Sequence, residues 1–143
     1  MVLVAKDIVE KDFLSLPRGT TAFEAAKRMK SDKHGFVIVV SEKEEPEGIV
    51  TEWDFLSKIV AEGKDPSKVK LEDVMSGNLV TVKASDGLDY VSQIMAEKGI
   101  RRVLVLENGK VIGTITARTM LARMKDYIDR VSTQIARLQV PKL

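Results

Sequence analysis

The sequence predicts an α/β protein built from two copies of one β-α-β-β-α unit. The first sign of the repeat is a pair of stretches, GIVTEWDFLSK (48–58) in the first half and GTITARTMLAR (113–123) in the second. Both begin with glycine and reach a threonine three residues later. The two halves also align over most of their length when one is shifted by 66 positions. Such a repeat indicates that the same supersecondary unit occurs twice.

The alignment continues through acidic, apolar and glycine positions. After the turn at residues 41–47 the shift becomes 65, because one residue is lost in a hairpin loop, where such changes are tolerated. Matched pairs are Asp7 with Asp73, Ile8 with Val74, Met29 with Met95, Gly48 with Gly113 and Thr51 with Thr116.

Each half is expected to contain a short strand, a helix, a strand, a hairpin turn, a strand and a second helix. Apolar residues at helical spacing indicate the helices, and Asn-Gly in ENGK (107–110) indicates a tight hairpin. The expected ranges are 13–16 and 79–82 for the short strands, roughly 21–32 and 87–98 for the first helices, 36–40 and 102–106 for the central strands, strand ends at Thr51 and Thr116, and second helices from near Glu52 and Ala117.

We divide the chain into a first repeat at residues 1–66 and a second at residues 67–125, with the joint in AEGKDPSKV (61–69). A unit of about 60 residues with one small sheet is marginally stable alone. The two units are therefore expected to pack sheet to sheet with approximate two-fold symmetry and to share a core. Packing of this kind creates a cleft between the two units.

The composition excludes several classes of function. Hydrophobic residues make up 44% and charged residues 31% of the 143 residues, as in a soluble globular protein. The net charge of +2 argues against a nucleic-acid groove or an anionic membrane. The absence of cysteine and the single histidine, His34, argue against a metal site. We expect a cytoplasmic protein without catalytic activity, since no nucleophile, base and electrophile come together and no apolar run spans a membrane.

These features resemble a tandem pair of cystathionine-β-synthase (CBS) domains, or Bateman module, over nearly everything before about residue 125. The residues that carry the resemblance are PRGTTAFEAAKRM (17–29), the strand FVIVV (36–40) and the pattern G-h-h-T-x-x-D met by Gly48, Thr51 and Asp54. The resemblance implies a stand-alone regulatory module that binds an adenosine nucleotide (AMP, ADP or ATP) in its cleft and requires no cofactor. S-adenosylmethionine is the alternative ligand.

The chemistry of the pattern supports a nucleotide. Thr51 ends a strand just ahead of a helix, where its hydroxyl and the first backbone N–H groups suit a phosphate. Asp54, in the first helical turn, suits the hydroxyls of a ribose. The alternative is that both residues only cap the helix. The repeat around them favours the nucleotide.

The resemblance implies the other contacts of this first site. Arg101 and Arg102, from the second repeat, are expected to reach across the cleft, with Arg102 facing the phosphate. The residues expected to contact the base are Thr20, Ala25, His34, Gly35, Phe36 and Ile49.

The second site is expected to be lost or altered. Thr119 stands where the first repeat has Asp54, so a ribose there loses its carboxylate acceptor. Gly35 and Phe36 face this site from the first repeat, at the positions where the second repeat has arginines. An acid and a facing arginine are both present for one site and both missing for the other, which predicts one ligand per chain.

A long helix is expected at residues 118–140, stopped by Pro141. Its apolar residues alternate steps of three and four, the spacing of a coiled-coil seam, at Leu121, Met124, Ile128, Val131, Ile135 and Leu138. The alternative is that the stripe packs on the chain's own domain, which we expect for Leu121 and Met124. The last three turns are expected to meet a partner helix, so we expect a homodimer, in addition to a regulated protein that the sequence does not identify. The competing hypothesis is a structural dimer module with an empty cleft.

Overall fold

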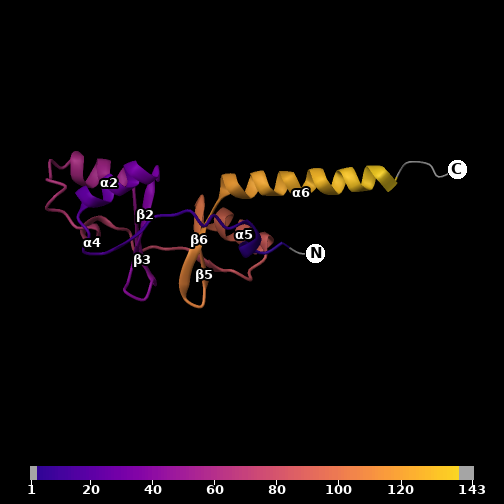
Figure 1. Cartoon of the computed structure of the whole chain (residues 1–143), viewed down its shortest axis with the longest axis horizontal. Helices are drawn as coiled ribbons and strands as arrows, with labels where there is room; N and C mark the ends of the chain where they lie inside the picture. Colours follow the sequence, from indigo (N-terminus) through magenta and orange to yellow (C-terminus); the bar gives the residue numbers. More distant parts are fainter. Residues whose placement is uncertain (1–2, 139–143) are drawn as a thin grey trace.

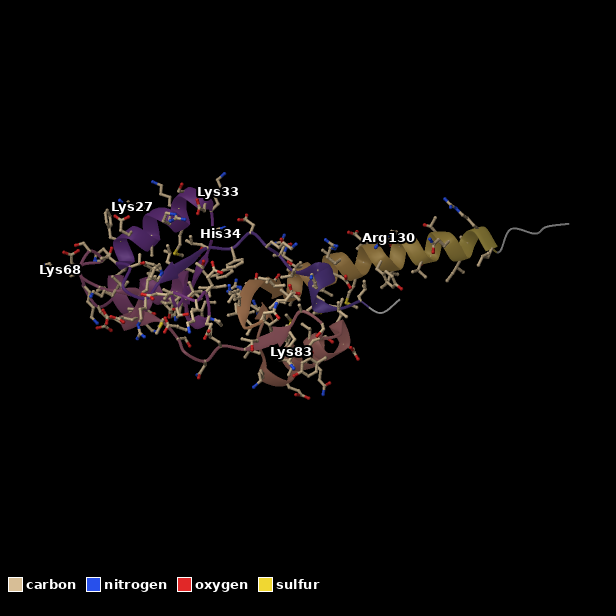
Figure 2. All side chains as sticks on the ribbon, turned by 60° about the horizontal axis from the view of Figure 1, so that its bottom comes forward. Lys27, Lys33, His34, Lys68, Lys83 and Arg130 are labelled. Atoms are coloured by element: carbon tan, nitrogen blue, oxygen red, sulfur yellow. The ribbon has the colours of Figure 1, made fainter. Side chains whose placement is uncertain are left out.

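The computed structural model describes residues 3–138. Two three-stranded sheets carry helices beside them, and one long helix extends away from both (Figure 1). Charged side chains such as Lys27, Lys68 and Lys83 lie on the outside (Figure 2). The elements are α1 Ala5–Ile8, β1 Ser15–Pro17, α2 Ala22–Asp32, β2 Phe36–Val40, β3 Pro46–Thr51, α3 Glu52–Phe55, the π-helix η1 Leu56–Val60, α4 Leu71–Val74, β4 Thr81–Lys83, α5 Leu88–Lys98, β5 Arg102–Glu107, β6 Lys110–Thr116 and α6 Ala117–Leu138.

The fold contains the predicted β-α-β-β-α unit twice. In each sheet the first strand runs parallel to the central strand, which pairs antiparallel with the third, in the orders β1-β2-β3 and β4-β5-β6. The register places Phe36 opposite Thr51 and Arg102 opposite Thr116. The predicted α/β class with a C-terminal helix is therefore confirmed.

Local signals in the sequence determine where the first helix of each repeat begins and ends. Thr21 caps α2, because its hydroxyl accepts a backbone N–H from the first turn at 3.2 Å. The helix ends at Lys33 with φ of 61°, and α5 ends at Gly99 with φ of 62°. Both residues adopt the left-handed conformation common at helix ends. Asn108, with φ of 54°, closes the β5–β6 hairpin as predicted.

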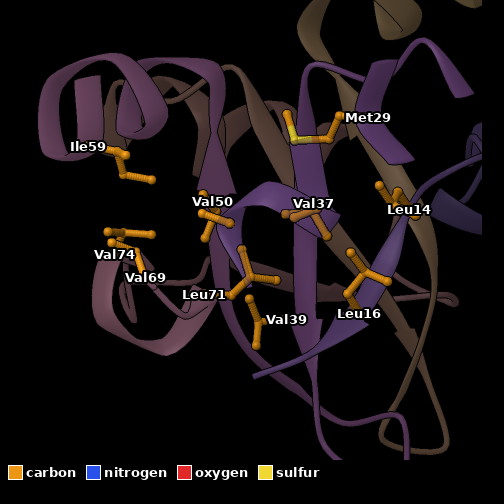
Figure 3. Packing of buried hydrophobic residues seen from close by; sticks show 12 residues of the cluster. Leu14, Leu16, Met29, Val37, Val39, Val50, Ile59, Val69, Leu71 and Val74 are labelled. Carbon is orange, nitrogen blue, oxygen red and sulfur yellow. The ribbon is translucent and has the colours of Figure 1, made fainter. Parts of the chain in front are cut away.

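The buried side chains form two clusters, so the prediction of one shared core is wrong. One cluster packs α2 against β1–β3 and includes Val37, Val39 and Val50 (Figure 3). The other packs α5 and the start of α6 against β4–β6. Each sheet turns one face to its own helices, and strand alternation puts most apolar side chains on that face. Ile38 and Leu104, at 0% and 2% exposure, are buried on the opposite faces, where the two sheets meet.

Two four-residue helices that the sequence patterns did not predict, α1 and α4, are exchanged between the repeats. Ala5 and Ile8 of α1 are buried in the second cluster, and Leu71 and Val74 of α4 are buried in the first. Figure 1 shows α4 beside β3, the last strand of the first repeat. Each repeat is thus completed by the helix that precedes the other repeat in the chain.

The segment after each exchanged helix pairs with the same repeat as the helix. Ser76 and Ile49 of β3 exchange backbone hydrogen bonds of 2.9 and 3.1 Å. Glu10 and Thr114 of β6 form the equivalent pair, with bonds of 2.8 and 3.0 Å. The approximate two-fold symmetry of the repeats therefore extends to these connections.

This pairing explains the glycine that begins each copy of the repeated pattern. A Cβ atom on Gly48 would lie 2.6 Å from Met75 Sδ, in the segment that follows α4. A Cβ atom on Gly113 would overlap the backbone carbonyl oxygen of Glu10, in the segment that follows α1. Both glycines allow the exchanged segments to approach closely.

The last helix, α6, leaves the second repeat after its first turn (Figure 1). Met120 is its one buried residue. Arg123 connects the helix to α1, because its guanidinium donates to the carbonyl oxygen of Asp7 at 3.1 Å. The predicted helix bounds agree with the structure up to Leu138, and residues 139–140 and Pro141 lie outside the described residues.

Candidate functional site

The first predicted site begins at the step from β3 into α3. Thr51 caps α3, and its hydroxyl accepts the backbone N–H of Asp54 at 3.4 Å. In return, Asp54 Oδ2 accepts the backbone N–H of Thr51 at 2.8 Å and its hydroxyl at 3.2 Å. The two residues form a capping box. The capping role considered from the sequence is therefore present in this structure.

The other carboxylate oxygen of Asp54 pairs with a residue that the sequence reasoning missed. Lys58 Nζ lies 3.0 Å from Asp54 Oδ1 and donates to the carbonyl oxygen of Val74, at the end of α4, at 2.9 Å. The spacing of four residues on one helix was the available signal. Lys58 matches Arg123 of the second repeat, which bonds to α1 in the same way. The acid of the predicted site is thus connected to the exchanged helix.

Arg102 reaches the first repeat from the start of β5. Its guanidinium carbon lies 3.9 Å from the centroid of the Phe36 ring, and Phe36 pairs with Thr51 across β2 and β3. The Nε atom of Arg102 is buried and has no hydrogen-bond partner within residues 3–138. Burial lowers the pKa of the guanidinium, which stays a cation at neutral pH. A partly buried cation with an unused donor therefore lies near the Thr51–Asp54 pair.

The equivalent step in the second repeat, from β6 into α6, has no carboxylate. Thr116 Oγ1 donates to Thr119 Oγ1 at 2.9 Å and accepts the backbone N–H of Thr119 at 3.0 Å. Two hydroxyls that bond to each other replace the acid and threonine of the first repeat. They offer a sugar hydroxyl a neutral acceptor, whose hydrogen bonds are weaker than those of a carboxylate.

His34 and Gly35 line a pocket of about 480 Å³ between the end of α2 and α3. His34 Nε2 lies 3.2 Å from Asp12 Oδ1. A Cβ atom on Gly35 would lie 2.6 Å from Glu52 Oε1, so this glycine makes room for the Glu52 side chain. The capping pair and Arg102 lie outside the lining of the pocket. The predicted site residues therefore fall into two neighbouring groups, one around Phe36 and one at the pocket.

The structure places the four remaining predicted contact residues, Ala25, Thr20, Ile49 and Arg101, in different surroundings. Ala25 has 0% exposure in the first cluster, so no surface of it can meet a ligand in this structure. Thr20 is half-buried, and its carbonyl oxygen accepts the backbone N–H of Leu71 at 2.9 Å. Ile49 is half-buried and paired with the segment that follows α4. Arg101 is exposed just before β5.

Comparison with known proteins connects this arrangement to a family. The model of the CBS domain family matches residues 5–61 and again residues 71–126. The chain belongs to the CBS domain family. Its two matches make a CBS pair, and each match begins at an exchanged helix, α1 or α4. The resemblance found in the sequence is confirmed.

A curated relative and a solved structure extend this finding. An uncharacterised protein of Methanopyrus kandleri is 37% identical over 116 residues, which are 80% of this chain and 59% of that protein. The chain spans little more than half the length of this relative and of an uncharacterised protein of Methanocaldococcus jannaschii, to which it is 30% identical over 103 residues. A hexameric CBS-CP12 protein from bloom-forming cyanobacteria is 32% identical, with a TM-score of 0.72 over 85% of this chain and 67% of that one.

Two further CBS structures were solved with ligands. A CBS domain pair in complex with 5′-methylthioadenosine and S-adenosyl-L-methionine is 25% identical, with a TM-score of 0.72 over 85% of this chain and 99% of that one. A CBS domain protein from Pyrobaculum aerophilum in complex with AMP is 22% identical, with a TM-score of 0.71 over 82% and 89%. At that identity, the second likeness shows a shared fold.

Two searches of the described residues bear on other kinds of site. No helix between residues 3 and 138 is both long and apolar enough to cross a membrane. Within the same range, no three histidine, aspartate or glutamate side chains are grouped so that they could hold a metal ion.

Proposed function

We propose that this CBS pair is a regulatory module that binds one adenosine nucleotide per chain in the cleft between its repeats. The ribose lies against Asp54, and the phosphate faces the guanidinium of Arg102. The observation that carries the proposal is the partly buried Arg102, held over Phe36 from the opposite repeat, whose Nε has no acceptor within the described residues. Ligand binding then changes how the module acts on a protein that it regulates.

The surroundings of Arg102 favour an anionic ligand. Burial of a cation is unfavourable unless a charge or a hydrogen-bond acceptor compensates for lost water. The Phe36 ring, 3.9 Å away, attracts the guanidinium through its π electrons but supplies no acceptor for Nε. A phosphate supplies both the opposite charge and several acceptor oxygens, and its geometry matches the planar guanidinium.

Asp54 has acceptor capacity left for one ribose hydroxyl. A carboxylate oxygen has two lone pairs, and Oδ2 uses both on Thr51. The other oxygen, Oδ1, bonds to Lys58 at 3.0 Å and can accept one more hydrogen bond. The sequence suggested bonds to both ribose hydroxyls. The geometry supports one charged hydrogen bond while Lys58 stays in place.

Solved relatives support an adenosine ligand, which in one of them carries a phosphate and in another a sulfonium group. AMP, S-adenosyl-L-methionine and 5′-methylthioadenosine, the ligands of the two relatives above, share adenine and a ribose. Of these, AMP carries an anionic phosphate, whereas S-adenosyl-L-methionine carries a sulfonium cation close to its ribose. Because a cation at Arg102 would repel the sulfonium group, we propose the phosphate-bearing ligand.

Titration calorimetry with AMP, ADP and ATP tests the proposed stoichiometry. We expect one nucleotide per chain, because Thr116 and Thr119 bond to each other and give the second site no carboxylate. Two equivalent sites per chain would contradict this expectation. A chain that binds none of these nucleotides would instead support the competing hypothesis of a structural module.

Arg102→Ala is expected to weaken AMP binding about tenfold or more and adenosine binding much less. The reason is that the AMP phosphate loses its hydrogen bond to the charged guanidinium, which contributes about 1.5 kcal/mol or more. Adenosine has no phosphate and therefore has no such hydrogen bond to lose. Calorimetry with both ligands measures the change in preference. Arg101→Ala, which removes the exposed neighbouring cation, is the control. An equal loss for AMP and adenosine would show that Arg102 does not bind the phosphate.

A further inference from the structure

A continuous apolar stripe, the α6 seam, runs along the exposed length of α6. Ile128 is 57% exposed, Ile135 is 49% exposed and Leu138 is 83% exposed. Alternating steps of three and four keep such residues on one side of a helix, as at the a and d positions of a coiled coil. The seam consists of Leu121, Met124, Ile128, Val131, Ile135 and Leu138.

Within residues 3–138, no other element covers the seam. After Met120, α6 has no buried residue, and Figure 2 shows the helix around Arg130 extending away from the rest of the chain. A helix without tertiary packing is marginally stable in water. The β-branched residues Ile128, Val131 and Ile135 lower its intrinsic stability further. The exposed part of α6 therefore needs an apolar partner along the seam to remain helical.

The polar residues of α6 indicate what that cover is. Partner helices of different sequence are usually selected by charges at the positions beside the seam. From Leu121, where the seam begins, to Leu138, these positions carry one charge, at Lys125, which already pairs with Asp129 at 3.3 Å; the others are Tyr127, Ser132 and Gln134. The other charges of this stretch lie on the outer face, at Arg123, Asp126, Asp129, Arg130 and Arg137, and Arg118 precedes the seam.

This distribution suits two identical helices. Two copies of α6 can meet along their seams without bringing like charges together, because the outer faces stay in water. Isoleucine at 128 and 135, one heptad apart, is typical of two-stranded coiled coils. We infer that α6 pairs with α6 of a second copy of this chain to form a two-stranded coiled coil. This inference does not depend on the ligand proposed above.

Light scattering on the full chain and two variants tests the inference. The parent is expected to have the mass of at least two chains. Ile135→Asp, which places a charge in the seam, is expected to halve the mass at the same concentration. Thr133→Asp adds the same charge two residues away, on the outer face, and is expected to keep the mass of the parent. Both positions are exposed, so the two repeats should fold equally well in all three proteins.

A thermal melt of each variant checks that the repeats are folded. A parent with the mass of a single chain would overturn the inference and point to a different partner for the seam. The same conclusion follows if Ile135→Asp keeps the parent mass, since the chains would then associate through another surface. Equal loss of mass in both variants would show that charge alone, and not the seam, controls assembly.

Discussion

Asp54→Asn is expected to lower the affinity for AMP on the order of tenfold to a hundredfold. The substitution keeps the size of the side chain and one acceptor oxygen, but it removes the charge that we propose to bind a ribose hydroxyl. A hydrogen bond to a charged group contributes about 1.5–3 kcal/mol, which corresponds to this range. Calorimetry is expected to show the same loss for adenosine, because both ligands carry the ribose. Arg102→Ala should instead lower the affinity for AMP much more than the affinity for adenosine.

Asp54→Asn also affects the fold, so it needs a matched control. Asp54 bonds to Thr51 and Lys58, and the loss of its charge is expected to cost about 1 kcal/mol of folding stability. Asp73 accepts the backbone N–H of Lys70 at 3.0 Å in the same way, at the start of α4. Asp73→Asn should lower the melting temperature without changing AMP affinity. If Asp54→Asn binds AMP as tightly as the parent, the proposed ribose contact is wrong.

Gly113→Ala is expected to destabilise the chain by about 3 kcal/mol, the upper end of the usual cost of overpacking. The added methyl group would overlap the backbone carbonyl oxygen of Glu10. The backbone of Glu10 is held in place, because its carbonyl oxygen accepts the N–H of Thr114 and its N–H donates to the carbonyl oxygen of Thr114. Backbone fixed in this way cannot move without breaking those bonds. Urea unfolding followed by circular dichroism measures the change in the free energy of unfolding.

Gly48→Ala, at the equivalent position of the first repeat, is the comparison for Gly113→Ala. Its methyl group would meet the side chain of Met75, which is flexible and can turn aside. We expect a loss of about 1 kcal/mol, at the lower end of the same range. Equal losses in the two variants would show that the close approach of Glu10 is not what requires a glycine at 113.

The fold could be predicted from the sequence because the repeat defined each element twice. The helices at 22–32 and 88–98 follow from apolar spacing, and the hairpin at Asn108 follows from its turn residues. The exchanged helices α1 and α4 could not be predicted in this way. Four residues are too few for a periodic pattern, and their place depends on which repeat can bury them.

The candidate site could be predicted in part. Aligning the repeats selected Thr51 and Asp54 as a pair, and the resemblance to CBS pairs implied that Arg102 faces them. The contact between Arg102 and Phe36 came from the structure. The alignment gave no indication that Lys58 would occupy one oxygen of the acid. Side-chain partners of this kind depend on how a helix is rotated against its neighbours, which sequence spacing alone does not determine.

Because α1 and α4 are exchanged, the molecule has two sequence repeats but one unit of folding. A cut in the joint at 61–69 would leave the first fragment without Leu71 and Val74, which are buried in its cluster. The second fragment would lack Ala5 and Ile8 of its own cluster for the same reason. Each fragment would carry the piece that the other needs. The two halves of the chain are therefore complementing fragments, and neither one is a domain that can be removed and studied alone.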